Sequence, residues 1–330
     1  AMPKPGVPSR EDWQVVAAIV AQSPDSSANL AYTGDKQFLF SPQRDAFVML
    51  AKQGRSCIVM GDPIGNERAF PELVSAYIDM CDRYDLWPAF YQVGKGWLDL
   101  YVQAGLTLLK LGEEARIPLG TFALDGPQNA KFRYMLRKGE RQGLSFSIVA
   151  VSDTSAQMHD MESVSGEWLE AKGGQEKGFS LGRFDPVYLQ HFPIAIVKMD
   201  GRIVAFANLW PGSGEEFSID LMRQMRDCPN GTMDYLFVQL MTWGRAQGFA
   251  WFNMGMAPLS GTDASAKWSQ WAKLSDIAYE HGNYFYNFKG LRQYKEKFDP
   301  LWEPRFLAVP GGMTLPRVVI DLARLINIEA

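Results

Sequence analysis

The sequence predicts a mixed α/β (α+β) protein built from two similar halves. Two stretches, 46–65 and 193–212, each consist of an apolar run, a turn, a second apolar run and a Pro/Gly stop. Gly54 and Gly201 in the turns can adopt the positive φ that a tight hairpin requires. Behind each hairpin, helix-like and strand-like segments alternate, which favours a sheet with helices over a helical bundle. We therefore expect a duplicated domain with one substrate cleft between its copies.

The expected elements form matching pairs along the two halves. After the hairpins come helix-like 71–86 and 231–249, strand-like 88–93 and 250–254, amphipathic 96–105 and 290–298, and strand-like 108–119 and 301–309. A further amphipathic helix is expected at 11–22. We interpret 213–230 as an insertion in the second half. An amphipathic helix at 314–330, with Thr314 as N-cap, should end the chain and pack either on the protein or on a membrane surface.

A basic segment between the halves sets the predicted domain boundaries, which are 1–125, 126–143 and 144–330. As a helix, this linker would carry apolar residues on one side and five cations in the opposite arc: Lys131, Arg133, Arg137, Lys138 and Arg141. The chain has a formal net charge of −4, so any nucleic-acid site must be local. The cations form either the solvated face of a connecting helix or a docking surface for phosphates.

Several common chemistries lack their sequence signatures in this chain. There is no phosphate loop, no dinucleotide fingerprint and no nucleophile elbow, and the three cysteines have no zinc spacing, so we expect no cofactor and no metal. The order of elements is similar to that of acyl-CoA N-acetyltransferases. However, neither hairpin is followed by their glycine-rich pyrophosphate turn, and Asp62 stands where a phosphate would sit in the first copy. These departures indicate an acyl donor other than CoA.

Several charged residues occupy positions that suggest a site. Asp220 and Arg223 lie three apart and, if helical, would share one face, either as a surface pair or within a site. Asp234 opens a predicted helix, where a carboxylate is favourable in any case. Glu303 and Arg305 lie in the last strand-like segment beside apolar residues, so they require partners, and a structural ion pair would suffice.

Three runs carry a resemblance to a known family. They are SIDLMR (218–223), PNGTMDYLF (229–237) and YNFKGLRQYKEKFDPLWEPRFLAVP (286–310). They resemble the C-terminal catalytic domain of bacterial aminoacyl-phosphatidylglycerol synthases, the multiple peptide resistance factor family, and the resemblance covers essentially the whole chain. It implies two tandem acetyltransferase-like (GNAT) folds joined by a basic helix, as in Fem-type peptidoglycan aminoacyltransferases.

The resemblance also implies a reaction and a location. An aminoacyl group, alanine rather than lysine, would pass from aminoacyl-tRNA to a glycerol hydroxyl of phosphatidylglycerol. One ester replaces another, which fits the missing phosphate loop. The family places this domain at the cytoplasmic face of the bacterial inner membrane, after a membrane-spanning region that this chain does not contain.

By the same resemblance, Asp220, Arg223 and Lys295 would be the active-site residues. Asp220 would hold the α-ammonium group or polarise the attacking hydroxyl, and the two cations would bind phosphate or the developing oxyanion. Weaker candidates for substrate binding are Tyr286, Lys289, Glu303, Arg305 and Asp234, and the five linker cations would bind tRNA. Two alternatives remain, a Fem-like enzyme acting on a peptidoglycan precursor and a non-catalytic module that binds tRNA or lipid.

Overall fold

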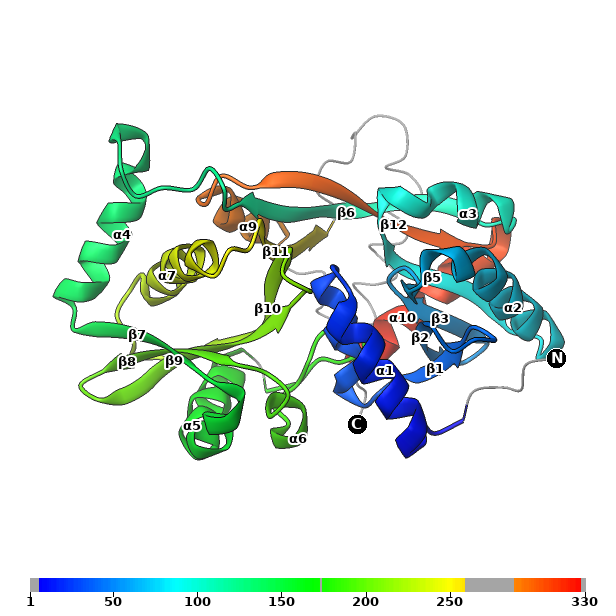
Figure 1. The fold of residues 1–330 in the computed structure, drawn as a ribbon, viewed down its shortest axis with the longest axis horizontal. Coiled ribbons are helices and arrows are strands. Elements are labelled where there is room, and N and C mark those ends of the chain that lie inside the picture. Colours follow the sequence, from blue (N-terminus) through cyan, green and yellow to red (C-terminus); the bar gives the residue numbers. More distant parts are fainter. Residues whose placement is uncertain (1–5, 173, 259–287, 328–330) are drawn as a thin grey trace.

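One mixed sheet runs through both halves of the molecule. The computed structural model describes residues 6–172, 174–258 and 288–327. Its strands follow the order β1-β2-β3-β5-β12-β6-β11-β10-β9-β8-β7, with β4 paired to β2. In Figure 1 the first half lies on the right and most of the second half on the left, with β6 and β12 running along the top between them. The predicted mixed α/β class is confirmed.

The first half contains the predicted helix, hairpin, helix and strand in order. Its elements are α1 (Arg10–Gln22), β1 (Gln37–Phe40), β2 (Ala46–Gln53), β3 (Ser56–Met60), β4 (Ile64–Gly65), α2 (Phe70–Arg83), β5 (Trp87–Val93), α3 (Leu98–Gln103) and β6 (Thr107–Pro118). A 3₁₀ turn, Ser26–Thr33, follows α1. Gly54 turns the β2–β3 hairpin with a φ of 56°, which fits the expectation for this position.

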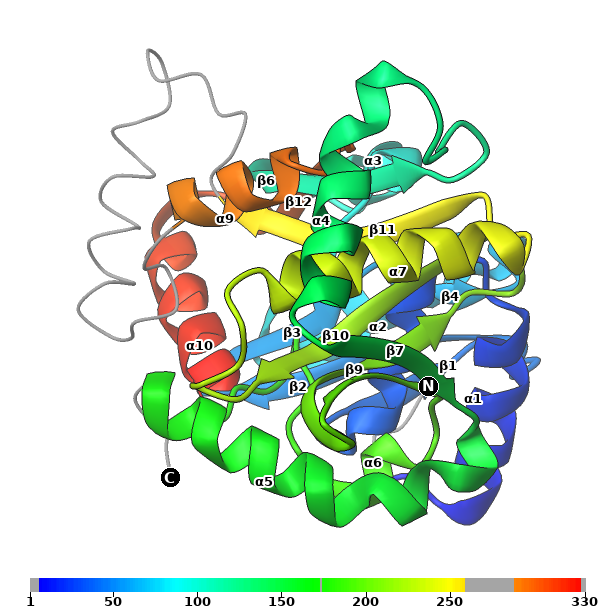
Figure 2. The same ribbon diagram turned by 90° about the vertical axis from the view of Figure 1, so that its left-hand side faces the viewer.

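The second half repeats this order with additions. Its elements are α4 (Ala130–Arg141), β7 (Leu144–Val149), α5 (Thr154–Lys172), α6 (Pro186–Leu189), β8 (Ile194–Met199), β9 (Arg202–Pro211), β10 (Glu216–Gln224), α7 (Thr232–Ala246), β11 (Trp251–Pro258), α9 (Phe288–Glu296), β12 (Leu301–Val309) and α10 (Leu315–Asn327). The basic linker is thus helical, and Figure 2 shows it lying across α7. Gly139 permits this contact, since a Cβ there would lie 2.4 Å from the Tyr235 ring.

The segment predicted as an insertion is a strand of the sheet. β10 pairs in parallel with β11, as β3 pairs in parallel with β5, so β10 is the counterpart of β3. The hairpin at 193–212 therefore corresponds to β8 and β9, one strand earlier than its sequence likeness to 46–65 suggested. Residues 218–223 form a strand, so the condition under which Asp220 and Arg223 would share a helix face is not met. Alternating burial of Leu221 and Arg223 against the more exposed Met222 and Gln224 gives them the period of a strand.

The last strand and the last helix lie against the first half. β12 pairs with both β5 and β6, and α10 packs on β2 and β3. The apolar stripe of α10 is buried, and its Asp321 accepts a 2.6 Å hydrogen bond from Ser56. For this helix, packing on the protein itself is confirmed. The boundaries at residues 125 and 143 stay a prediction.

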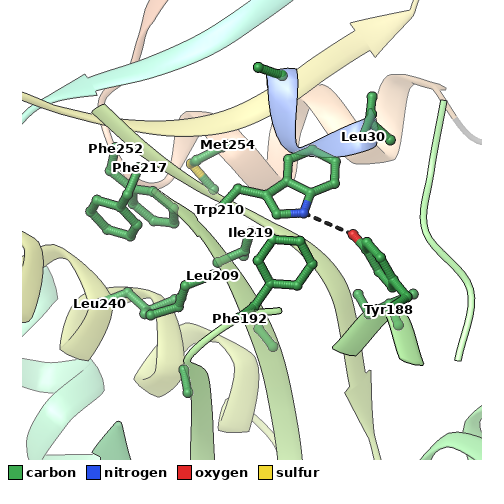
Figure 3. Packing of buried hydrophobic residues seen from close by; sticks show 14 of the residues in the cluster. Leu30, Tyr188, Phe192, Leu209, Trp210, Phe217, Ile219, Leu240, Phe252 and Met254 are labelled. Atoms are coloured by element: carbon green, nitrogen blue, oxygen red, sulfur yellow. Dashed lines mark hydrogen bonds between the residues drawn. The ribbon is translucent and has the colours of Figure 1, made fainter. Parts of the chain in front are cut away.

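The core crosses the junction between the halves. Figure 3 shows Leu30, from the 3₁₀ turn of the first half, beside Trp210 and Tyr188 of the second half. The Trp210 indole donates a 2.8 Å hydrogen bond to the Tyr188 hydroxyl. None of the helices in the described part of the chain is long and apolar enough to cross a membrane.

Candidate active site

A cavity of about 530 Å³ lies between the halves. Its polar lining combines residues from both of them: Ser26, Ser27, Gln92, Glu114, Ser180, Ser218, Asp220, Asn253 and Lys295. Methionines and other apolar residues line the rest: Leu30, Met60, Leu181, Trp210, Ile219, Met222, Met254, Met256, Pro258 and Leu291. One cleft between two halves was the prediction, and a cavity is found there.

The cavity exists because two parallel strands separate. β10 and β11 are paired from Glu216–Trp251 to Ser218–Asn253 and no further. Beyond that point each strand shifts register against its other neighbour, β10 between Ile219 and Met222 and β11 between Asn253 and Met256. Such bulges re-aim side chains. Asp220 lies in the first bulge, where its side chain lines the cavity.

Asp220 is held by two donors from the second half. Its carboxylate accepts a 2.6 Å hydrogen bond from the Tyr188 hydroxyl and 3.0 Å contacts from the Gly182 N–H. Burial raises the pKa of Asp220 to about 6, although these donors and the charges of Arg223 and Lys36 lower it. The group is therefore mostly ionised near neutrality while remaining able to take a proton.

Lys295 lines the same cavity from α9. Its side chain is buried, and its ammonium donates to the carbonyls of Gly255 and Met256 at 2.9 and 3.0 Å. Burial lowers the pKa of Lys295 to about 7, and the nearby charge of Glu114 opposes this shift. An amine in this range can hold or release a proton at physiological pH.

Arg223 is not among the described residues that line the cavity. It is 3% exposed and forms a two-point ion pair with Glu176, at 2.7 and 2.5 Å. It also donates to Ser165 and lies 4.9 Å from the Trp168 ring centre. The structure thus brings Asp220 and Lys295 together and directs Arg223 away from them, where it acts on Asp220 through its charge.

The weaker candidates have separate positions. Arg305 forms an ion pair with Glu114, and Glu303 lies 3.3 Å from Arg116. Asp234 pairs with Lys297 at 3.2 Å beside a second cavity of about 400 Å³. Lys289 lies in the first turn of α9, and Tyr286 lies outside the described residues. Glu303 and Arg305 thus have ion-pair partners, and their role in substrate binding stays a prediction.

Several residues of the site were not predicted from the sequence. Glu114 is 6% exposed and lines the cavity, and Arg305 beside it lowers its pKa although burial opposes this. Two adjacent glutamates inside an apolar strand were a signal that could have revealed it. Tyr188 and Gly182 carry no such local signal, because only the tertiary fold brings them to Asp220.

The cations of α4 differ in their surroundings. Lys131 pairs with Asp299 at 2.7 Å, and Arg133 donates to the carbonyls of Leu124 and Gly126. Lys138 lies near Gly231 at the start of α7. Arg137 and Arg141 are exposed and make no ion pair within the part of the chain that the structure describes. Tyr134, which is 60% exposed, lies beside them.

The fold and this cavity define a two-halved α/β protein with one polar site at the junction. A family model described as "Phosphatidylglycerol lysyltransferase, C-terminal" matches residues 17–309, and the chain belongs to this family. The phosphatidylglycerol lysyltransferase of Bacillus subtilis is 38% identical over 304 residues, which are 91% of this chain and 35% of that protein. The chain thus spans about a third of the curated relatives that it matches.

Solved structures agree with this assignment. The structure of L-PGS from Bacillus licheniformis has a TM-score of 0.87 at 36% identity, covering 99% of each chain. A C-terminal domain from Agrobacterium fabrum, assigned to a lysylphosphatidylglycerol synthetase, has a TM-score of 0.88 at 40% identity and covers 96% of this chain and 97% of its own. FemX shares the fold alone, with a TM-score of 0.57 at 11% identity over 93% of this chain and 98% of its own.

Proposed function

We propose that this chain transfers an aminoacyl group from aminoacyl-tRNA to a glycerol hydroxyl of phosphatidylglycerol. The observation that carries the proposal is the pairing of Asp220 and Lys295 in one cavity, in a chain that belongs to the phosphatidylglycerol lysyltransferase family. Both groups change protonation near neutrality, as acid–base and oxyanion roles require.

The reaction exchanges one ester for another. The glycerol oxygen bonds to the aminoacyl carbonyl carbon, the bond to the ribose oxygen breaks, and the glycerol proton ends on that ribose oxygen. In our proposal the Asp220 carboxylate holds the α-ammonium group of the amino acid. The Lys295 ammonium stabilises the oxyanion of the tetrahedral intermediate. Arg223 contributes through its charge and through Glu176 rather than by touching substrate.

Incubation with radiolabelled aminoacyl-tRNA and phosphatidylglycerol vesicles, followed by thin-layer chromatography of the lipids, tests this function. Asp220→Asn and Lys295→Met should each lower the transfer rate by about 100-fold or more. Asp85→Asn, in an exposed turn, is the matched control and should leave the rate unchanged. A peptidoglycan precursor as sole acceptor tests the Fem-like alternative. Variants that change only binding would indicate a non-catalytic module.

We further propose alanine as the transferred amino acid, although the curated relatives above are named lysyltransferases. Lysine brings a second ammonium group, which needs a carboxylate when buried. Among the described lining residues, the carboxylates are Asp220, assigned to the α-ammonium group, and Glu114, already paired with Arg305. Parallel assays with alanyl-tRNA and lysyl-tRNA test this assignment, and faster transfer of lysine would overturn it.

The tRNA body is proposed to bind along α4. Arg137 and Arg141 are the cations available for phosphates, and Lys138 continues the positive charge to the start of α7. The second cavity lies there, with Trp168, Tyr294 and Lys172 in its wall. Met222 lines both cavities, and we propose that the acceptor end of the tRNA binds in the second cavity, beside the one that holds Asp220.

The location of the reaction belongs to the same proposal. Phosphatidylglycerol resides in a bilayer, and none of the described helices is suited to crossing one. The chain covers about a third of the length of its curated relatives. We propose that the domain works at the cytoplasmic face of the bacterial inner membrane, beside a membrane-spanning region of the full-length protein.

A further inference from the structure

A buried lysine of the first half lies close to the site without lining it. The Lys36 side chain is 0% exposed, and its ammonium donates to Asp35 at 2.6 Å, to the Thr33 hydroxyl at 2.7 Å and to the Leu30 carbonyl at 3.3 Å. Burying an ammonium group is costly unless its partners are complete. Neither Lys36 nor Asp35 is among the described residues lining the cavity. The pair therefore needs a purpose other than substrate contact.

Asp35 uses its second oxygen to hold the other half of the molecule. It accepts a 2.7 Å hydrogen bond from the Phe179 N–H. Phe179 has a φ of 60°, a left-handed conformation that is strained for a bulky residue and persists only where its surroundings impose it. Its ring is 2% exposed, and the Lys36 ammonium lies 5.5 Å from the ring centre. The ion pair thus fixes a strained residue through both its backbone and its side chain.

Phe179 belongs to a segment that forms one wall of the cavity. We call residues 176–184 the wall segment. It presents the Gly182 N–H to Asp220 and places Ser180 in the cavity lining, with a hydroxyl that has no hydrogen-bond partner within the described part of the chain. A Cβ at Gly182 would lie 2.0 Å from an Asp220 oxygen, so the segment has almost no freedom of position there.

The wall segment is anchored separately at its beginning. Glu176 accepts the two-point ion pair of Arg223 and a 3.1 Å hydrogen bond from the Phe184 N–H. The Gly178 N–H donates 2.9 Å to the Ile326 carbonyl of α10. From the first half, the Asp35 carboxylate holds the Phe179 backbone, and the Phe179 ring stacks on Tyr91 of β5, with ring centres 6.4 Å apart.

We propose that Asp35 and Lys36 are positioning residues: they fix the wall segment from the first half and so hold the Asp220 carboxylate and the Ser180 hydroxyl in place for the transfer reaction. The activity consequences rest on the proposed function, whereas the structural consequence does not. The arrangement makes the geometry of a site in the second half depend on the first half.

Lys36 also acts on Asp220 electrostatically. The charged or titratable groups around Asp220 are Tyr188 on α6, Arg223 on β10 and Lys36 beyond the 3₁₀ turn, with Lys295 on α9 and Glu114 on β6 in the cavity lining. The charge of Lys36 lowers the pKa of Asp220 against the effect of burial. Removing that charge should raise this pKa.

Hydrogen exchange of the full chain tests the structural part without any substrate. Asp35→Ala should accelerate amide exchange in a peptide covering 178–184 by about 10-fold or more relative to peptides of β8 and β9. Tyr77→Phe is the matched control, because it removes the buried hydrogen bonds that the Tyr77 hydroxyl forms with the Cys57 carbonyl and the Ala89 N–H elsewhere in the first half. It should leave amide exchange in 178–184 unchanged, even where it lowers the thermal midpoint as much as Asp35→Ala does. Unchanged exchange in Asp35→Ala would overturn the proposal.

If Asp35→Ala fails to fold, the double variant Asp35→Ala/Lys36→Met removes the same acceptor and also the buried ammonium that would be left unpaired. This variant should show the same acceleration of amide exchange in 178–184. Unchanged exchange in the double variant would also overturn the proposal. In the transfer assay, Lys36→Met should move the acidic limb of the kcat profile upward by about half a pH unit. An unshifted limb contradicts the electrostatic role. If the unmodified chain transfers no aminoacyl group, the proposed function is refuted. The hydrogen-exchange result would still decide whether Asp35 and Lys36 fix the wall segment.

Discussion

At the scale of single residues, the groups proposed for chemistry are ionisable side chains whose burial lowers the stability of the fold. Burial lowers the pKa of Lys295 from its ordinary 10.5 to about 7. Between these values the unfolded chain binds more protons than the folded one, so this residue makes stability increase as pH rises. Below about pH 7 both states carry the charge, and the full cost of burying it applies.

We therefore predict that Lys295→Met, which removes the charge, is most stable relative to the unmodified chain at low pH. Its thermal midpoint relative to that of the unmodified chain should be highest near pH 6 and fall steadily towards pH 10, while transfer activity is lost at every pH. Calorimetric scans of both proteins across this range measure the difference. A difference that stays constant with pH would show that Lys295 keeps its ordinary pKa.

The sequence predicted single residues unevenly. The resemblance singled out Asp220 and Lys295, which lie far apart in the chain and meet in the cavity. It grouped Arg223 with them through the same SIDLMR run, but the bulge that contains Asp220 and the alternation of faces in a strand direct Arg223 towards α5. Lys36, Gly182 and Tyr188 were not predicted, because their importance arises from contacts that no local pattern encodes.

At the scale of elements, the packing of α4 on α7 depends on a glycine. A Cβ at Gly139 would overlap the Tyr235 ring, whereas Gly166 on α5 has nothing within 4 Å of a Cβ. We predict that Gly139→Ala lowers the free energy of unfolding by about 1–3 kcal/mol through overpacking. Gly166→Ala should raise it by up to about 1 kcal/mol, because alanine favours a helix interior. Urea denaturation of both variants measures these changes, and equal effects would contradict the close contact.

The exposed cations of α4 give a second prediction at this scale. Arg137→Glu/Arg141→Glu should raise KM for aminoacyl-tRNA without changing the dependence on lipid, and should reduce the log–log salt slope of tRNA binding by roughly two units. Arg133 is unsuitable for this test, since it holds the carbonyls of Leu124 and Gly126. An unchanged salt slope would leave α4 as the solvated face of a connecting helix.

Most elements were predictable, and the chief error lay in their correspondence. Apolar periodicity placed α2, α7, β5 and β12 close to their observed bounds. The likeness of 46–65 to 193–212 aligned the halves one strand out of step, because β2, β3, β8 and β9 are all continuous apolar runs and so look alike in sequence. Only the parallel pairing of β10 with β11 identifies the true counterpart of β3, and pairing between distant strands is not visible in local sequence.

At the scale of the whole molecule, each half depends on the other, because elements from the end of the chain complete the first half. β12 lies between β5 and β6, so the last strand of the chain completes the sheet of the first half. α10 covers β2 and β3 with its buried face, and Asp321 fixes it to Ser56. A fragment that ends at residue 125 lacks both elements and exposes the edges of β5 and β6, which are ready templates for aggregation.

We therefore predict that residues 1–125 alone do not fold, although this range was the expected first domain. Joining residues 300–327 to that fragment through a flexible linker should restore a folded unit, because it returns β12 to its place between β5 and β6 and α10 to its place on β2 and β3. Amide dispersion in NMR spectra and a cooperative urea transition measure folding of each fragment. A well-dispersed spectrum from 1–125 alone would mean that the first half is independent, and that β12 joins a sheet already formed.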